Sequence, residues 1–252
     1  VNNIPLDRCA KAGIVVFNTP GANANAVKEL VLCGMLLASR NVPAALTWAK
    51  GLSEDVSKTV EKGKSQFAGH EILGKTLGIV GLGAIGRKVA EAAKALGMNI
   101  VGYDPYYVSG GEGLTVYPDL AEMLPLCDIV TLHLPANDAT RGMVNKEFLA
   151  SMKDGAILLN FSRDKLVNDV DLLVALESGK LTQYVTDFPN DNLIGREHIT
   201  LLPHLGASTA EAEDNCATMA VMELRDYFEN GNIINSVNFP KVDMGPLGDL
   251  RR

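Results

Sequence analysis

The sequence predicts an α/β fold, in which a doubly wound parallel sheet carries helices on both faces. Short apolar runs of strand length alternate with helix-length segments along most of the chain, and this alternation is typical of βαβ units. The expected strands in the second half cover residues 129–132, 156–160, 183–187 and 199–202. The expected helices between them cover residues 120–124, 146–152 and 169–178. Right-handed crossovers would bring the carboxyl ends of these strands to one edge of the sheet.

The most specific pattern lies in residues 76–104. An apolar strand at residues 77–80 runs into the turn Gly-Leu-Gly-Ala-Ile-Gly at residues 81–86. A helical pattern follows, and then a second strand at residues 99–103 that ends at an acid. This order of strand, glycine turn, helix, strand and acid predicts a Rossmann-type dinucleotide site.

Each glycine of this turn has a separate physical role. Gly81 permits the tight turn, Gly83 lets backbone N–H groups approach a pyrophosphate, and Gly86 lets the helix pack closely on the strand. The N–H groups of Ala84 and Ile85 belong to the helix N-terminus, where the macrodipole favours an anion. We therefore expect these five residues to hold the diphosphate of the coenzyme.

Asp104 follows Gly86 by 18 positions, close to the offset at which an acid accepts hydrogen bonds from the adenosine ribose. A carboxylate there would repel a 2′-phosphate. The sequence therefore predicts NAD as the cofactor, rather than NADP.

Charge and composition narrow the class of partner. The 252 residues are 47% hydrophobic and 21% charged, which is ordinary for a globular protein. Their formal net charge of −7 argues against nucleic acid or an anionic membrane as a partner. An anionic substrate would then need local basic side chains. No apolar run reaches the length that crosses a bilayer. The four cysteines are scattered without zinc-ligand spacing, so we expect reduced thiols, no metal site and a cytoplasmic location.

Three expected strand ends supply chemistry at the same edge of the sheet. Arg163 follows one strand, Asp187 ends the next and Asp191 follows it, and His204 follows the last. Oxidation of an alcohol by hydride transfer needs a base for the hydroxyl proton and a cation for a neighbouring carboxylate. His204 fits the base and Arg163 fits the cation, because a guanidinium can clamp a carboxylate with two hydrogen bonds. The alternatives are a packed or surface histidine and a surface ion pair between Arg163 and Asp164.

The two aspartates have two interpretations each. Asp191 could hydrogen-bond His204 or be a solvated loop acid. Asp187 could face the nicotinamide amide or cap a turn. His133 is expected to line the coenzyme cleft without taking part in proton transfer. The other residues expected to line the coenzyme site are Pro135, Phe161, Ser162, Gly206 and Ala207.

These residues resemble the D-isomer-specific 2-hydroxyacid dehydrogenase family. The resemblance extends over nearly the whole chain, from residues 1–5 and 17–27 to residues 235–240. The Arg, acid and His of that family occur in the same order here, as Arg163, Asp191 and His204. The resemblance implies NAD-dependent oxidation of 3-phospho-D-glycerate to 3-phosphohydroxypyruvate, the first step of serine biosynthesis. Alternatives are a relative acting on glyoxylate, hydroxypyruvate or D-lactate, and a non-catalytic module that senses NADH.

Two substitutions depart from the family pattern. The family acid is usually glutamate, whereas Asp191 is one methylene shorter, so contact with His204 needs a loop movement or a bridging water. The glycine that commonly follows the family arginine is replaced by Asp164, whose charge would weaken the binding of an anionic substrate.

The resemblance also implies how the domains are organised. Residues 1–206 are expected to form the NAD-binding domain, and residues 207–252 a C-terminal helix and tail that belong to a substrate domain. The N-terminal half of that substrate domain is expected to be absent, so we expect slow turnover by this chain alone. The helix after Asn23 is too apolar for an exposed surface, and the family forms dimers through this region, so a homodimer is expected.

Overall fold

The computed structural model describes residues 3–107 and 111–245. The described residues form two compact units, one within residues 27–206 and the other of residues 3–26 together with residues 207–245. Residues 1–2 of the family-like N-terminal motif and residues 246–252 of the predicted C-terminal segment lie outside the described residues.

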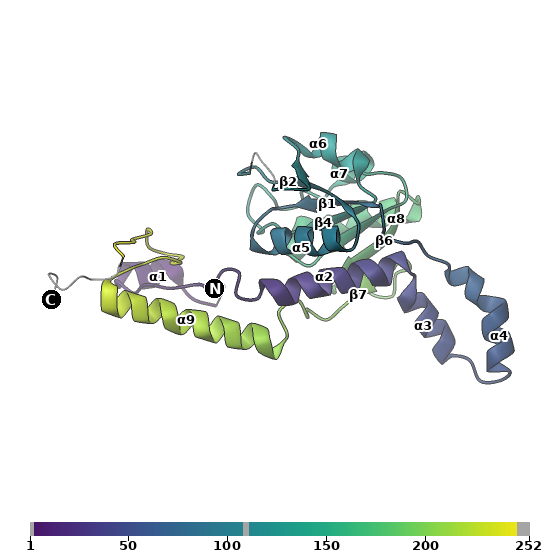
Figure 1. Cartoon of the computed structure of the whole chain (residues 1–252), viewed down its shortest axis with the longest axis horizontal. Coiled ribbons are helices and arrows are strands. Elements are labelled where there is room, and N and C mark those ends of the chain that lie inside the picture. The colour runs from purple at the N-terminus through teal and green to yellow at the C-terminus, as the bar shows by residue number, and fades with distance from the viewer. Residues whose placement is uncertain (1–2, 108–110, 246–252) are drawn as a thin grey trace. The chain divides into compact units, whose positions relative to one another are not determined.

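The larger unit is built on a seven-stranded sheet (Figure 1). Its strands are β1 (Thr76–Val80), β2 (Asn99–Tyr103), β3 (Leu114–Val116), β4 (Ile129–Leu132), β5 (Ala156–Asn160), β6 (Leu181–Thr186) and β7 (Ile199–Leu201). The strand order is β3-β2-β1-β4-β5-β6-β7, and each neighbouring pair is parallel. This order confirms the predicted doubly wound sheet. Strand β3 was not predicted, because three residues are too few for a periodic signal.

Helices lie on both faces of this sheet or extend from it (Figure 1). They are α2 (Ala24–Ser39), α3 (Val42–Lys50), α4 (Val56–Gly63), α5 (Ala84–Ala95), α6 (Leu120–Met123), α7 (Lys146–Ser151) and α8 (Asp169–Glu177), with short 3-10 turns at η1 (Lys64–Phe67), η2 (Leu124–Leu126) and η3 (Asp164–Leu166). Pro43 stands in the first turn of α3, where its missing N–H breaks no helical hydrogen bond.

Two hydrophobic cores lie on the opposite faces of the sheet. One contains side chains from α2 and α5, and the other contains side chains from α6, α7 and α8. Along β5, Ile157 and Leu159 join the first core, whereas Leu158 joins the second. Successive side chains of a strand point to opposite faces, so a strand covered on both sides is apolar throughout. Polar residues are therefore left for the strand ends.

Helix α2 packs part of its apolar stripe on the sheet. Val27, Val31 and Met35 are buried in the core that α2 shares with α5, and the predicted homodimer stays a prediction. Leu36 remains 44% exposed. No single helix in the described part of the chain is long and apolar enough to cross a membrane, although α2 and α3, bent by 68° at their break, reach that length and composition together.

The smaller unit contains α1 (Leu6–Lys11) and α9 (Ala210–Asn230). Residues 3–26 of this unit pack with residues from 207 onward, and Phe17 makes an isolated bridge with Ser236. Asn238 helps to join the two segments, since its side chain accepts from the Val16 N–H and donates to the Ile14 carbonyl, each at 2.9 Å.

Replacing Asn238 with Ala should loosen the N-terminal segment from the tail. The variant removes the side-chain hydrogen bonds to Val16 and Ile14, and the one accepted from the Ser236 hydroxyl, and should lower the free energy of unfolding by about 1 to 2 kcal/mol. Hydrogen exchange at the Val16 amide should become at least severalfold faster. Lys241→Ala, at an exposed position of the same tail, is the control. Unchanged exchange at Val16 in Asn238→Ala would show that these bonds do not hold the segment.

Candidate active site

The candidate site lies where the strand order of the sheet reverses. Strands β1 and β4 are neighbours, but the chain continues from β1 to β2 on one side, and from β4 to β5 on the other. Ligands of open α/β sheets bind outside the carboxyl ends of the strands at such a point. The glycine turn follows β1 and His133 follows β4, so both lie at this edge.

The glycine turn is shaped by close backbone contacts. Gly81 has φ +102°, and a Cβ there would lie 2.5 Å from the His133 carbonyl oxygen. A Cβ on Gly86 would collide with the carbonyl oxygen of Gly81. A Cβ on Gly83 would meet nothing within 4 Å, and Gly83 is exposed. Gly81 and Gly86 are therefore needed by the fold itself, whereas Gly83 leaves open space above the turn.

This open space fits a coenzyme diphosphate. Gly83 is the N-cap of α5 and offers no side-chain capping bond, so the N–H groups of Ala84 and Ile85 keep their capacity to donate to a ligand. Ala84 is exposed and Ile85 is partly exposed.

Asp104 is attached to the same turn. Its Oδ2 accepts from the Leu82 N–H at 2.8 Å, and its Oδ1 accepts from the Tyr106 N–H at 2.9 Å. A carboxylate offers about four lone-pair sites, so these two bonds fix its orientation and leave acceptors for ribose hydroxyls.

Asp187 is a buried carboxyl at the end of β6. Its side chain is 1% exposed, and its Oδ2 accepts from the Gly206 N–H at 2.9 Å. Its Oδ1 is buried without a partner among the described residues. Burial raises the pKa of Asp187, while the Gly206 N–H and nearby His204 oppose that rise. An unsatisfied buried oxygen is costly, which favours a ligand donor such as an amide at this position.

His204 lies beside Asp187. Its backbone N–H donates to the Asp187 carbonyl at 2.9 Å, and its ring centroid is 5.0 Å from that of Phe188. The residue is exposed and has φ 52°, in the left-handed region that a side chain with a Cβ rarely adopts. Such strain is often found at functional positions.

Arg163 and Asp191 follow the neighbouring strands β5 and β6, and both are exposed. The Arg163 guanidinium donates to the Ser162 carbonyl at 2.6 Å. Asp164 is paired with Lys165 at 3.4 Å, so the expected alternative of an Arg163–Asp164 pair is not what the structure contains. The structure brings His204 together with Asp187, and it places Arg163 and Asp191 on adjacent strand ends.

Asn160 is a site residue that sequence reasoning missed. It is fully buried at the end of β5, where its Nδ2 donates to the Arg163 carbonyl at 2.9 Å and to the Tyr184 hydroxyl at 3.4 Å. Its Oδ1 accepts from the Ser162 N–H at 3.2 Å. These bonds shape the turn that presents Arg163. The available signal was a polar amide directly after an apolar strand.

The remaining predicted coenzyme residues have different environments. The ring of Phe161 is buried in the core with α2, so only its main chain is open to a ligand. The Ser162 hydroxyl donates to the Leu134 carbonyl at 2.5 Å. Pro135 is exposed on the loop after β4, and Ala207 is the first residue of the second segment of the smaller unit.

His133 is held neutral. Burial lowers the pKa of this imidazole to about 3. Its Nε2 lies 3.1 Å from the Thr131 hydroxyl, and its Nδ1 is buried without a partner in the described part of the chain. A neutral ring at physiological pH is a poor proton carrier, which agrees with its expected role as a wall of the cleft.

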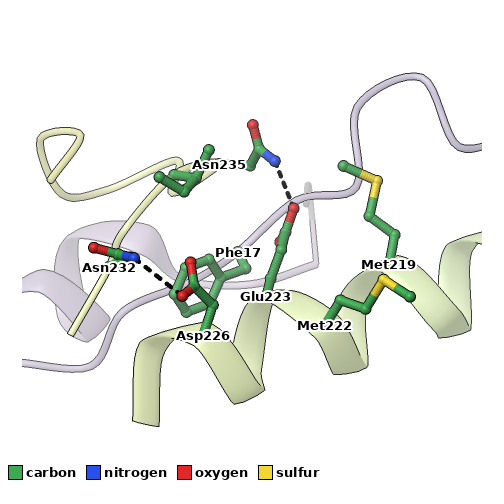
Figure 2. A pocket seen from close by; sticks show the side chains of 8 residues that line it. Phe17, Met219, Met222, Glu223, Asp226, Asn232 and Asn235 are labelled. Atoms are coloured by element: carbon green, nitrogen blue, oxygen red, sulfur yellow. Dashed lines mark hydrogen bonds between the residues drawn. The ribbon is translucent and has the colours of Figure 1, made fainter. Parts of the chain in front are cut away.

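The smaller unit holds a separate cavity of about 300 Å³ (Figure 2). Met219, Met222 and two acids of α9 line it, and the acids are held by asparagines. Asn235 donates to Glu223 at 2.5 Å and Asn232 donates to Asp226 at 3.0 Å, as Figure 2 shows. None of the residues predicted for catalysis or coenzyme binding lines this cavity.

Comparison with known families identifies the larger unit. Residues 32–206 match the model of the NAD-binding domain of the D-isomer-specific 2-hydroxyacid dehydrogenases. The matched range contains the whole sheet and every predicted site residue except Ala207.

Curated relatives agree with this match. The chain is 36% identical over 260 residues to D-3-phosphoglycerate dehydrogenase of Methanocaldococcus jannaschii, covering 100% of the chain and 48% of the relative. It is 37% identical to the enzyme of that name from Haemophilus influenzae, covering 96% of the chain and 60% of the relative. The chain thus spans about half the length of these relatives.

Solved structures of related enzymes share the fold. A glyoxylate reductase from Paecilomyes thermophila is 31% identical with a TM-score of 0.79, and the match covers 94% of this chain and 72% of that chain. D-mandelate dehydrogenase from Rhodotorula graminis is 26% identical with a TM-score of 0.85, covering 96% of this chain and 73% of that chain.

Gly83 and Gly86 should respond differently to the same substitution. Gly86→Ala should lower the free energy of unfolding by about 1 to 3 kcal/mol, because its Cβ collides with backbone that cannot move aside. Gly83→Ala should leave stability within about 0.5 kcal/mol of the wild type but weaken NADH binding about tenfold, because the methyl group occupies the space above the turn. Urea unfolding and NADH fluorescence titration measure the two effects. Equal destabilisation by both substitutions would contradict the assignment.

His133 should make stability depend on pH below neutrality. The folded protein keeps this ring neutral to about pH 3, whereas the unfolded chain takes up a proton near pH 6.5, so stability falls as the pH falls between these values. Between pH 7.5 and pH 5 the contribution of this residue should fall by about 2 kcal/mol. Urea unfolding at several pH values should show that His133→Gln lacks this part of the slope. His70→Gln, at an exposed position, should keep it; equal slopes in wild type and His133→Gln would contradict the account.

Proposed function

The chain belongs to the D-isomer-specific 2-hydroxyacid dehydrogenase family, and we propose that it supplies the coenzyme-binding and proton-transfer machinery of an enzyme that oxidises 3-phospho-D-glycerate. The observation that carries this proposal is the Asp104 carboxylate, tied to the glycine turn with acceptor capacity left for a ribose. The family match makes NAD(H) the coenzyme.

The residues of the larger unit fit NAD in three places. The N–H groups of Ala84 and Ile85 would hold the diphosphate, and Asp104 would accept from the ribose hydroxyls and disfavour a 2′-phosphate. The unpartnered Oδ1 of Asp187 would accept from the carboxamide of the nicotinamide. When bound, the nicotinamide ring accepts the hydride of the alcohol.

Proton transfer and substrate binding are assigned to three side chains. His204 takes the proton of the substrate hydroxyl in the oxidation and returns it in the reduction. Arg163 clamps the substrate carboxylate with guanidinium N–H groups other than the one that donates to the Ser162 carbonyl. Asp191 orients His204 through a loop movement or a bridging water, since it lies on the exposed turn that follows β6.

The choice of substrate rests on the relatives. Both curated relatives described above, at 36% and 37% identity, are D-3-phosphoglycerate dehydrogenases, which supports oxidation to 3-phosphohydroxypyruvate at the entry to serine biosynthesis. A second candidate is reduction of glyoxylate or hydroxypyruvate, which the 31% identity to a glyoxylate reductase favours. A homodimer and a cytoplasmic location stay predictions from the sequence.

The test joins coenzyme binding and turnover. The 252-residue chain should bind NADH at least about tenfold more tightly than NADPH, because Asp104 repels the extra phosphate. Since the chain spans about half of its relatives, turnover is measured on the chain and on a hybrid carrying the remaining part of the Methanocaldococcus jannaschii relative. The chain alone should turn over slowly, and the hybrid should reduce 3-phosphohydroxypyruvate faster than glyoxylate.

His204→Gln in the hybrid tests the proton carrier. Turnover should fall about 100-fold or more with the NADH dissociation constant unchanged, because the base is removed and the coenzyme site is not. His70→Gln is the control. Equal affinity for NADH and NADPH would contradict the coenzyme assignment. Undiminished turnover in His204→Gln would contradict the role of the histidine, and NADH binding without turnover in the hybrid would favour a sensing module.

A further inference from the structure

The peptide groups of Leu82 connect the glycine turn to two side chains. The Leu82 N–H donates to Asp104 Oδ2 at 2.8 Å, and the Leu82 carbonyl accepts from Arg87 Nε at 2.9 Å. Arg87 is in the first turn of α5, directly after Gly86. One residue of the turn is thus bound by the acid at the end of β2 and by a cation of α5.

Arg87 continues from this anchor to the loop that follows Asp104. Its Nη2 donates to the hydroxyl of Tyr107, and its guanidinium carbon lies 4.6 Å from the centroid of the Tyr107 ring. A charge-assisted hydrogen bond and a cation–π contact therefore join the same two side chains. Because Nε is already held by Leu82, the guanidinium is fixed at both ends.

The loop itself is exposed. Tyr106 is 92% exposed and Tyr107 is 36% exposed. Two bonds shape the loop from within, since Asp104 Oδ1 accepts from the Tyr106 N–H and the Tyr107 N–H donates to the Asp104 carbonyl at 3.2 Å. These internal bonds do not attach the loop to α5, whereas the bond from Arg87 to Tyr107 does.

We propose that Arg87 and Tyr107 form a clamp that positions the adenosine half of the coenzyme site. The clamp holds the 104–107 loop against the first turn of α5, so that the free acceptors of Asp104 stay where the ribose binds. This inference rests on the proposed function, and neither residue is a catalytic residue. Without the clamp, binding must order the backbone of the loop, and that ordering weakens affinity for ligands that reach the loop.

The test compares a ligand that reaches the loop with one that does not. The ligands are NADH and reduced nicotinamide mononucleotide, which lacks the adenosine half, and both are titrated by fluorescence against the 252-residue chain. Arg87→Gln should raise the dissociation constant of NADH about 5- to 20-fold, and Tyr107→Phe about 2- to 5-fold, because the second variant keeps the cation–π contact. Binding of the mononucleotide should stay within about twofold of the wild type in both.

Each variant has a matched control from the same segment. Lys88→Gln removes an equal charge from the next position of α5, and Tyr106→Phe removes a hydroxyl from the exposed neighbour in the loop. Both controls should bind NADH as the wild type does. The double variant Arg87→Gln/Tyr107→Phe should be no weaker than Arg87→Gln alone, because the two residues act through one contact.

Hydrogen exchange gives a readout that does not depend on coenzyme. The amides of Tyr106 and Tyr107 should exchange faster in Arg87→Gln and at the wild-type rate in Lys88→Gln. Unchanged NADH affinity in Arg87→Gln, or equal weakening of both ligands, would overturn the clamp. Loss of NADPH affinity alone would instead show that Arg87 acts by charge on a 2′-phosphate. A wild-type chain that binds the mononucleotide but not NADH would refute the clamp together with the Asp104 assignment, whereas one that binds neither would refute the proposed function.

Discussion

The rest of the site depends on the contact between Gly86 and the Gly81 carbonyl. This contact lets the first turn of α5 approach the end of β1 more closely than any side chain would permit. The positive φ of Gly81 turns the chain past the His133 carbonyl, so the residues that follow β1 and β4 are closely packed. This packing positions Gly83, which is the exposed N-cap of α5, and Asp104, whose carboxylate accepts from the Leu82 N–H in the same turn. A methyl group on Gly81 or Gly86 would separate α5 from β1 and displace both Gly83 and Asp104.

Because the strands of this sheet are covered on both faces, their functional polar side chains are buried at the strand ends. The Asn160 side chain has hydrogen-bond partners for both its N–H and its carbonyl group within the turn that it supports. His133 and Asp187 differ, since each keeps one buried polar atom without a partner in the described residues. Leaving such atoms unsatisfied costs about 1 to 3 kcal/mol each, a cost that a bound ligand could offset. The two unsatisfied atoms follow β4 and β6, on either side of β5.

The sequence was informative where a local pattern determines the structure. Strands 129–132 and 156–160 were predicted with the observed limits, because continuous apolar runs bounded by polar residues have one interpretation in a parallel sheet. The attachment of Ile14 and Val16 to the C-terminal tail could not be predicted, because it involves Asn238, more than 220 positions away. The stripe of α2 was ambiguous for another reason, since an apolar helix face looks the same whether it packs on its own sheet or on another chain. The Arg87–Tyr107 contact was missed because no spacing rule joins a helix residue to the loop after the next strand.

Asp187 and Asp191 differ in burial and in their relation to His204. Asp187 is the carboxyl whose pKa responds to His204, yet it is 1% exposed and its Oδ2 is committed to the Gly206 N–H. Burial raises the pKa of Asp187, whereas the Gly206 N–H and nearby His204 oppose that rise. Asp191 is exposed, where water screens its interaction with an imidazole. The main-chain carbonyl of Asp187 accepts from the His204 N–H, and its carboxylate accepts from the Gly206 N–H, so Asp187 holds the backbone on both sides of Leu205. The backbone position of His204 therefore does not depend on the shorter Asp191 side chain.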